Sequence, residues 1–210
     1  MGCTMEEISI KDRKIYRFIT TDFKTNTYVL TDGHNIVIDP GELTLELEQF
    51  LYHNSPSHII LTHGHFDHIG GVKWLKRKFP KVKVCIHKKD AKLLSNPFLN
   101  LSAFTGRVVR SFSQDLLLEE GDFLNFKIIH TPGHSRGSIV LIGEGFCFSG
   151  DTLFIESIGR TDIPGASFKT LLRSLERLKK EIPETFFVFP GHGIYAPMKS
   201  VLDFNMFIQS

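Results

Sequence analysis

Three histidines and one aspartate lie within six residues of this sequence, in the segment HGHFDH at positions 63–68. An apolar run at 58–61 precedes the segment, and a stretch with helical spacing at 72–79 follows it. Short apolar runs bounded by turn residues are typical of buried strands. The sequence therefore predicts that the polar cluster lies in a loop between a buried strand and a helix, where α/β layer proteins commonly place their chemistry.

A metal ion would explain why such side chains gather, because burying a polar group without a partner costs about 2–7 kcal/mol. Imidazole nitrogens suit zinc, iron and manganese, and a carboxylate adds an oxygen ligand. His63 and His65 are two residues apart, so they point the same way in an extended segment. Asp67 and His68 come after the chain has begun to turn, so they can address a second point nearby. This spacing favours two neighbouring metal ions over one.

Three later strand-like runs also end in side chains that can bind metal. His134 follows a Pro-Gly turn, Asp151 ends a short strand, and His192 follows the last predicted strand. Two sites of three protein ligands each, with one shared carboxylate, would leave coordination positions open for water or substrate, as catalytic sites require. The candidate ligands are His63, His65, Asp67, His68, His134, Asp151 and His192.

Composition restricts the class of protein and the kinds of partner that can be expected. The 210 residues are 41% hydrophobic and 23% charged, which indicates a soluble globular protein of one large domain or two small ones. The net charge of +2 gives no reason to expect nucleic acid, and no apolar run suggests a signal peptide or a membrane span. Cys3, Cys85 and Cys147 form no CxxC motif, so no disulfide framework or cysteine metal site is expected. We expect a cytoplasmic protein with a small-molecule substrate, and the oligomeric state stays open.

Hydrophobic patterning predicts that strands and helices alternate along the chain. The order of elements in 26–65 is echoed in 137–192, so we expect two similar halves that meet at the site. The segment 88–122 should hold one or two short helices near 89–94, and it could cover the site. The predicted strands are 7–19, 26–30, 35–38, 58–62, 82–86, 123–129, 138–142, 146–148 and 185–189, and the predicted helices are 43–52, 72–79 and 168–182.

These motifs resemble those of the metallo-β-lactamase superfamily, and within it the single-domain, glyoxalase II-like branch. The matching segments are THGHFDH at 62–68, TPGHS at 131–135, GDTLF at 150–154, GRTD at 159–162 and GHG at 191–193. The resemblance implies a single domain over 1–210 with an α/β fold, a four-layer αβ/βα sandwich of two similar halves with the metals at the shared edge of the sheets. It also implies that His63, His65 and His134 bind one metal and that Asp67, His68 and His192 bind the other. Asp151 would then bridge the two.

The resemblance implies a dinuclear metallohydrolase that cleaves thioesters of the hydroxyacylglutathione type. A hydroxide between two divalent ions would attack the carbonyl, and Asp67 would orient the hydroxide and take its proton. Zinc is the favoured metal, and iron and manganese are compatible with the same ligands. One alternative is a persulfide dioxygenase, a relative that uses one iron bound by two histidines and an aspartate. Others are a lactonase or a phosphodiesterase on the same dinuclear site.

Three residues outside the ligand set are candidates for supporting roles. Asp39 either orients the metal loop or caps a turn. Arg160 either binds a substrate carboxylate or pairs with Asp162 in a structural turn. Tyr195 is a candidate substrate contact. Glyoxalase II enzymes tend to carry a tyrosine two places after the last histidine, and this sequence departs from that pattern, with Ile194 at that place and Tyr195 one place later.

Overall fold

The structure is a computed structural model that describes residues 5–111 and 113–209. Its first half forms a 7-stranded sheet in the order β1-β2-β3-β4-β5-β6-β7. The strands are β1 (Glu6–Ile10), β2 (Arg13–Thr20), β3 (Thr25–Leu30), β4 (Ile36–Ile38), β5 (His58–Leu61), β6 (Lys83–His87) and β7 (Leu116–Leu118).

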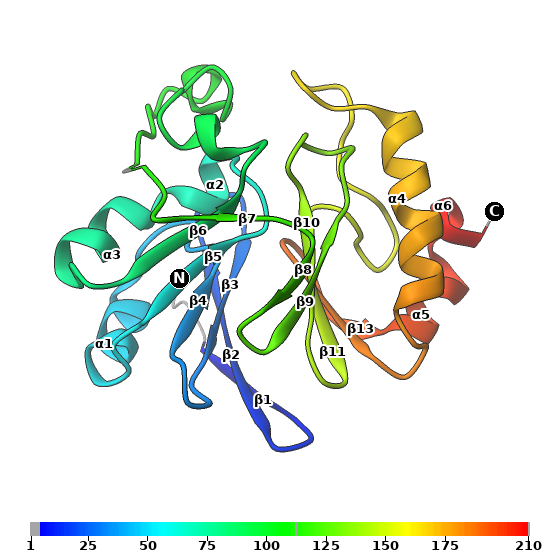
Figure 1. The fold of residues 1–210 in the computed structure, drawn as a ribbon, viewed down its shortest axis with the longest axis horizontal. Helices are drawn as coiled ribbons and strands as arrows, with labels where there is room; N and C mark the ends of the chain where they lie inside the picture. The colour runs from blue at the N-terminus through cyan, green and yellow to red at the C-terminus, as the bar shows by residue number, and fades with distance from the viewer. Residues whose placement is uncertain (1–4, 112, 210) are drawn as a thin grey trace.

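The second half forms a 6-stranded sheet in the order β13-β12-β11-β10-β9-β8. The two sheets pack face to face in the middle of the molecule (Figure 1), and aromatic residues such as Tyr28 and Phe148 fill the space between them. The strands are β8 (Gly121–Phe123), β9 (Phe126–His130), β10 (Ile139–Ile142), β11 (Phe146–Gly150), β12 (Phe187–Pro190) and β13 (Ala196–Pro197).

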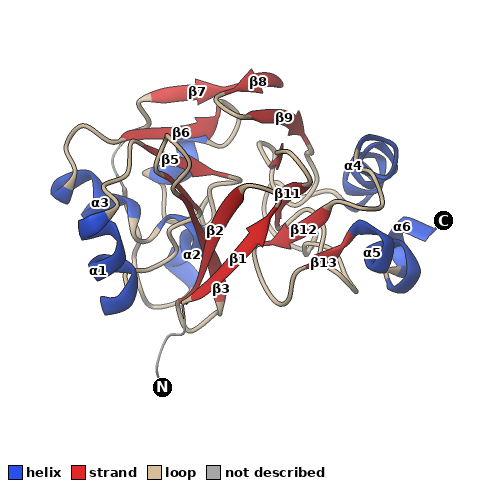
Figure 2. Ribbon diagram, turned by 90° about the horizontal axis from the view of Figure 1, so that it is seen from below, coloured by secondary structure: helices blue, strands red, loops and turns tan. Residues whose placement is uncertain are grey.

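Helices cover the outer faces of both sheets, as Figure 2 shows from below. The first sheet carries α1 (Leu45–His53) and α3 (Val72–Lys78), and the second carries α4 (Phe168–Glu181), α5 (Met198–Phe204) and α6 (Met206–Gln209). Ser167 caps α4, which buries Leu171, Leu175 and Leu178 against the second sheet in the i, i+4, i+7 pattern of an amphipathic helix. The predicted four-layer αβ/βα sandwich of two halves is therefore confirmed.

Parallel pairing explains why the polar loops meet at one edge. Strands β4, β5 and β6 are parallel neighbours, so Asp39, Thr62 and Asp90 all follow strand ends on the same side of the first sheet. In the second sheet β11 and β12 are parallel, which places Asp151 and His192 at the corresponding edge.

Hydrogen bonds join the two sheets beside this edge. The backbone N–H of Asn26 donates to the carbonyl of Gly191 at 2.7 Å, and the hydroxyl of Tyr28 donates to the carbonyl of Pro190 at 2.7 Å. The backbone N–H of Ile139 donates to the carbonyl of Thr62 at 2.9 Å. The two halves are thus held together next to the loops that carry the candidate ligands.

Several predicted elements differ from the observed ones. The single strand predicted for 7–19 is a hairpin of β1 and β2, because the chain turns at Lys11, which has a positive φ of 50°. The strand predicted for 123–129 is likewise divided into β8 and β9 by a turn at Leu124 with φ of 53°.

The segment 88–122 contains the short 3-10 helix η1 (Ala91–Leu94), where a helix was expected. It also contains a second 3-10 helix, η2 (Ser102–Phe104), and the strand β7, neither of which was predicted. Cys85 and Cys147 are buried and free, and Cys3 lies outside the described residues. In the described ranges we find no helix that combines the length and the hydrophobicity needed to span a bilayer.

Candidate metal centre

Asp39 organises the loop that follows β5. Its Oδ1 accepts the backbone N–H of Thr62 at 2.8 Å, and its Oδ2 accepts the hydroxyl of Thr62 at 2.5 Å. Its Oδ2 also lies 3.0 Å from Nδ1 of His68, which is carried by the one-turn helix α2 (Phe66–Ile69). With Nδ1 bound to this carboxylate, the Nε2 of His68 is left facing the centre. Asp39 therefore has the orienting role, the first of its two predicted alternatives.

The first group of candidate ligands consists of His63, His65 and His134. One ring nitrogen from each lies within 4.8 Å of the others, and Nδ1 of His65 is 2.9 Å from Nε2 of His134. The opposite nitrogen of His134 donates to the carbonyl of Arg160 at 3.0 Å, and Nδ1 of His63 lies 3.1 Å from the hydroxyl of Thr62. These contacts turn the remaining ring nitrogens toward a common point.

The second group consists of Asp67, His68 and His192. The two Nε2 atoms of the histidines are 3.3 Å apart, and Nε2 of His192 is 3.2 Å from Oδ2 of Asp67. Nδ1 of His192 donates to the carbonyl of Phe23 at 3.1 Å, which fixes the ring with Nε2 inward.

Asp151 lies between the two groups. Its Oδ2 is 3.6 Å from Nε2 of His134 and 3.5 Å from Nε2 of His192, while its Oδ1 is 3.4 Å from Nε2 of His68. The carboxylate therefore contacts members of both groups. All seven predicted ligands thus converge in the structure.

The residues present fit a pair of divalent cations. Nε2 of His63 and Oδ1 of Asp151 are buried and have no hydrogen-bond partner among the described residues. Such atoms are costly unless something else satisfies them, and a cation between the groups would satisfy both. Five imidazoles and two carboxylates form a mixed nitrogen and oxygen set that suits zinc, iron or manganese. A third possible group, Asp39 with His63 and His68, is less suited, because the oxygens of Asp39 are already bound to Thr62 and His68.

The ionisation of the site depends on burial and on its two carboxylates. Burial lowers the pKa of His65 to about 3, and burial together with the neighbouring His68 lowers that of His63 well below its ordinary value. Burial also opposes the charged form of His192, but hydrogen bonds with Asp151 and Asp67 outweigh it and raise its pKa to about 9. At neutral pH the metal-free site thus keeps His63 and His65 neutral and holds a proton on His192.

Metal binding is expected to release protons, since a ring nitrogen must be neutral to bind a cation. The pKa of His192 is about 9, and Asp151, Asp67 and Asp39 outweigh burial to raise that of His68 well above its ordinary value, so both rings are charged at neutral pH. The apparent affinity for zinc should therefore rise between neutral pH and about pH 9, the range over which His192 loses its proton. Calorimetric titration in buffers of different ionisation enthalpy counts the protons released. An affinity that does not change between neutral pH and pH 9 would contradict this.

Replacing Asp39 with asparagine is expected to weaken the second cation more than the first. The amide would present an N–H toward His68, which favours the tautomer whose Nε2 carries the proton and cannot bind metal. We expect a loss of about 10–100-fold in affinity for one of two cations, measured by competition with a chelator. Asp115→Asn is the matched control, because Asp115 also accepts a backbone N–H, from Val84, but lies away from the centre. An equal loss in both variants would contradict the orienting role.

Sequence reasoning missed Asp90, which joins two of the loops that carry candidate ligands. This buried carboxylate accepts the backbone N–H of Gly64 at 3.1 Å, the hydroxyl of Ser135 at 2.6 Å and the backbone N–H of Gly137 at 2.6 Å. Only its position just after β6 could have indicated the role. The carbonyls of Phe23 and Arg160 were missed as well, and main-chain groups leave no signal in a sequence.

Gly191 allows the last ligand loop to approach the centre. A methyl group at this position would overlap the carboxylate of Asp151 and lie 2.7 Å from Cε1 of His68. Any larger side chain there would displace two candidate ligands, which explains the glycine before His192.

The two predicted substrate contacts lie in different places. Arg160 forms a two-point ion pair with Asp162, both distances being 2.8 Å, and it also lines the pocket over the centre. Tyr195 instead donates its hydroxyl to Glu6 at 2.9 Å and packs on Phe189, and it does not line that pocket. Tyr195 thus joins the two sheets, through Glu6 of the first and Phe189 of the second, and lies outside the lining of the pocket.

The pocket over the centre has a volume of about 390 Å³ and a largely apolar wall. Phe66 and Phe154 line it, as does Leu101 from the 88–122 segment, so this segment does border the site. The apolar residues of the wall are Phe23, Phe66, Leu101, Phe154, Ile158 and Ile163.

Comparison with known proteins identifies the class that this fold and site define. A profile of the Metallo-beta-lactamase superfamily matches residues 20–192, so the chain belongs to this superfamily. It is 32% identical over 191 residues to the probable metallo-hydrolase YqgX of Bacillus subtilis, covering 86% of this chain and 90% of the relative. It is 30% identical over 213 residues to the hydroxyacylglutathione hydrolase GloC of Haemophilus influenzae, covering 90% of this chain and 95% of the relative. The protein is a metallo-hydrolase of the superfamily.

Solved structures agree with this assignment. The structure of the BLEG-1 B3 metallo-beta-lactamase matches with a TM-score of 0.87 and 34% identity, over 93% of this chain and 100% of that one. The di-iron-bound form of TTHA1623 matches with a TM-score of 0.82 and 35% identity, over 90% of this chain and 98% of that one.

Proposed function

We propose that the protein hydrolyses thioesters of the hydroxyacylglutathione type with two divalent cations held at the candidate metal centre. The observation that carries the proposal is the convergence of seven ligand side chains, in two groups that Asp151 contacts together. The similarity to a hydroxyacylglutathione hydrolase over 90% of the chain supports a thioester substrate.

The two cations would be held by the two histidine-rich groups, with Asp151 shared. When bound, they would lower the pKa of water so that a nucleophile exists at neutral pH, and they would polarise the substrate carbonyl. Zinc is our proposed metal on the grounds of ligand chemistry, and the di-iron-bound relative supports iron as the alternative.

Asp67 is the residue we assign to proton transfer. Burial opposes its charged form, but His68 and His192 outweigh burial and lower its pKa, so it stays ionised and can accept a proton. A thiol has a pKa of about 8.5, so a thiolate leaves without help from a further acid. The apolar wall around Phe66 and Phe154 would contact the acyl group and limit the access of bulk water.

Elemental analysis combined with a substrate panel tests this proposal. The panel is S-lactoylglutathione, a simple lactone, a phosphodiester, a β-lactam and glutathione persulfide. We expect about two metal ions per chain and turnover of the thioester above the other substrates. One iron per chain with oxygen consumption on the persulfide would instead favour the dioxygenase. Fastest turnover of the β-lactam would favour the activity named for BLEG-1, and either result would overturn the thioester assignment.

A further inference from the structure

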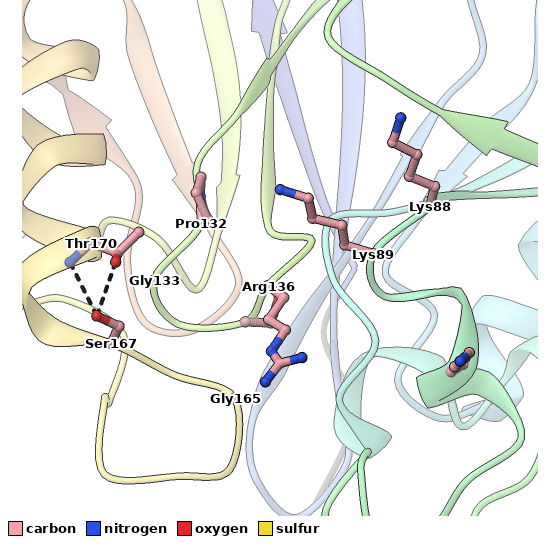
Figure 3. Close-up of a pocket in the computed structure, with 10 residues that line it drawn as sticks. Lys88, Lys89, Pro132, Gly133, Arg136, Gly165, Ser167 and Thr170 are labelled. Atoms are coloured by element: carbon pink, nitrogen blue, oxygen red, sulfur yellow. Dashed lines mark hydrogen bonds between the residues drawn. The ribbon is translucent and has the colours of Figure 1, made fainter.

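A cationic pocket lies beside the candidate metal centre, between η1 and the start of α4. Its volume is about 640 Å³. In Figure 3, Lys89 extends toward the Pro132–Gly133 turn, and Arg136 lies between this lysine and the beginning of α4. None of its described lining residues is acidic, and its cationic members are Lys88, Lys89, Lys92 and Arg136.

Most of the positive charge in this pocket is not neutralised within the described chain. Only Lys88 forms an ion pair, with Oε1 of Glu119 at 2.6 Å. Within residues 5–111 and 113–209, no carboxylate pairs with Lys89, Lys92 or Arg136. The nearby Asp90 already accepts hydrogen bonds from Ser135 and from backbone N–H groups, so its negative charge is stabilised by these donors and forms no ion pair with the three cationic side chains.

The N-terminus of α4 adds positive potential to the same pocket. Ser167 caps the helix by accepting the backbone N–H of Thr170 at 3.3 Å, and both residues line the pocket (Figure 3). A helix N-terminus carries a partial positive charge, which acidic residues in the first turn normally offset. The first turn of α4 has no acidic residue and contains Lys169. The cationic side chains and the helix dipole therefore both favour the binding of an anion in this pocket.

The cationic pocket is continuous with the metal centre. A smaller pocket of about 280 Å³ connects them, because it includes His65, which also lines the metal pocket. This connecting pocket shares Lys89, Lys92, Ser135, Arg136 and Gly165 with the cationic pocket. A long substrate could therefore place its reactive bond at the metals and a charged end among the lysines.

We propose that the cationic pocket binds phosphate groups on the thiol part of the substrate, an inference that rests on the proposed thioester hydrolysis. A glutathione thioester carries two carboxylates and an ammonium group, and the ammonium would be repelled here. A phosphorylated thiol carries several negative charges and no cation, which matches three unpaired cationic side chains. Within the proposed thioester hydrolysis, the cationic pocket thus favours acyl thioesters of phosphorylated thiols over those of glutathione, with the acyl group in the apolar pocket. Turnover of S-lactoylglutathione would then establish cleavage of the thioester bond, and the thiol preference is tested separately.

The test compares a triple variant, Lys89→Ala/Lys92→Ala/Arg136→Ala, with the unmodified protein, both loaded with metal. Substrates are the lactoyl thioesters of coenzyme A, of glutathione and of uncharged N-acetylcysteamine. The triple variant should raise KM for the coenzyme A thioester about tenfold or more, with kcat and the N-acetylcysteamine reaction within about twofold. Direct binding of desulfo-coenzyme A, which has the phosphates but no thiol, should weaken by the same factor. Lys81→Ala/Arg173→Ala/Lys180→Ala, at exposed positions elsewhere, is the charge-matched control.

Three results would overturn the inference. They are an equal KM for the coenzyme A and N-acetylcysteamine thioesters, desulfo-coenzyme A binding that the triple variant does not weaken, and tighter binding of a short RNA strand to the same residues. Absence of hydrolysis of every thioester would overturn the proposed function instead. The two failures can be told apart, since desulfo-coenzyme A binding is measured without turnover.

Discussion

Replacing Asp151 with alanine is expected to release both cations together and to lower kcat by about a thousandfold or more. The carboxylate lies 3.4–3.6 Å from ring nitrogens of both ligand groups, so its loss removes a ligand and a negative charge from each. Elemental analysis after dialysis should fall from about two metal ions per chain to well below one.

Asp122→Ala is the matched control, since Asp122 is an exposed aspartate in β8. It should keep the metal content and kcat of the unmodified protein. The bridging assignment is wrong if the Asp151 variant keeps one ion at full occupancy together with full activity.

Replacing His134 or His192 with alanine is expected to remove different cations. His134 belongs to the group with His63 and His65, and His192 to the group with Asp67 and His68. Each variant should retain about one ion, and kcat should fall about a hundredfold or more in both.

Cobalt loading distinguishes the two cases, because the ion that remains has three imidazole ligands in one variant and a carboxylate with two imidazoles in the other. The visible spectra of the two variants should differ, and their sum should approximate the spectrum of the unmodified protein. His53→Ala, at the exposed end of α1, is the control and should change neither spectrum nor rate. Identical spectra would mean that both histidines serve the same ion.

The convergence of the candidate ligands was predictable, because these side chains follow strand ends along the chain. Three histidines between 63 and 68 mark one edge of a sheet, and parallel strands bring later loops to the same edge. The hairpin of β3 and β4 was readable for a similar reason, since an Asp-Gly turn separates two apolar runs.

Other features of the fold and of the site could not be predicted from residue type. The turn at Lys11 contains no glycine or proline, so the division between β1 and β2 could not be read from residue type. β7 has only three residues, and its place in the sheet depends on pairing with β6, which is far away in sequence. The orientation of His134 and His192 depends on the backbone carbonyls of Arg160 and Phe23. Every residue has a backbone carbonyl, so residue type does not indicate these contacts.

Each candidate cation would take ligands from both sheets, and this has a consequence for the lifetime of the protein. His63 and His65 come from the first half of the chain and His134 from the second, while the other group combines Asp67 and His68 with His192. Pulling the halves apart would therefore require losing the ions, so the free energy of unfolding should grow with the logarithm of the free metal concentration. Under metal starvation such a protein would lose activity and become a better substrate for proteases at the same time.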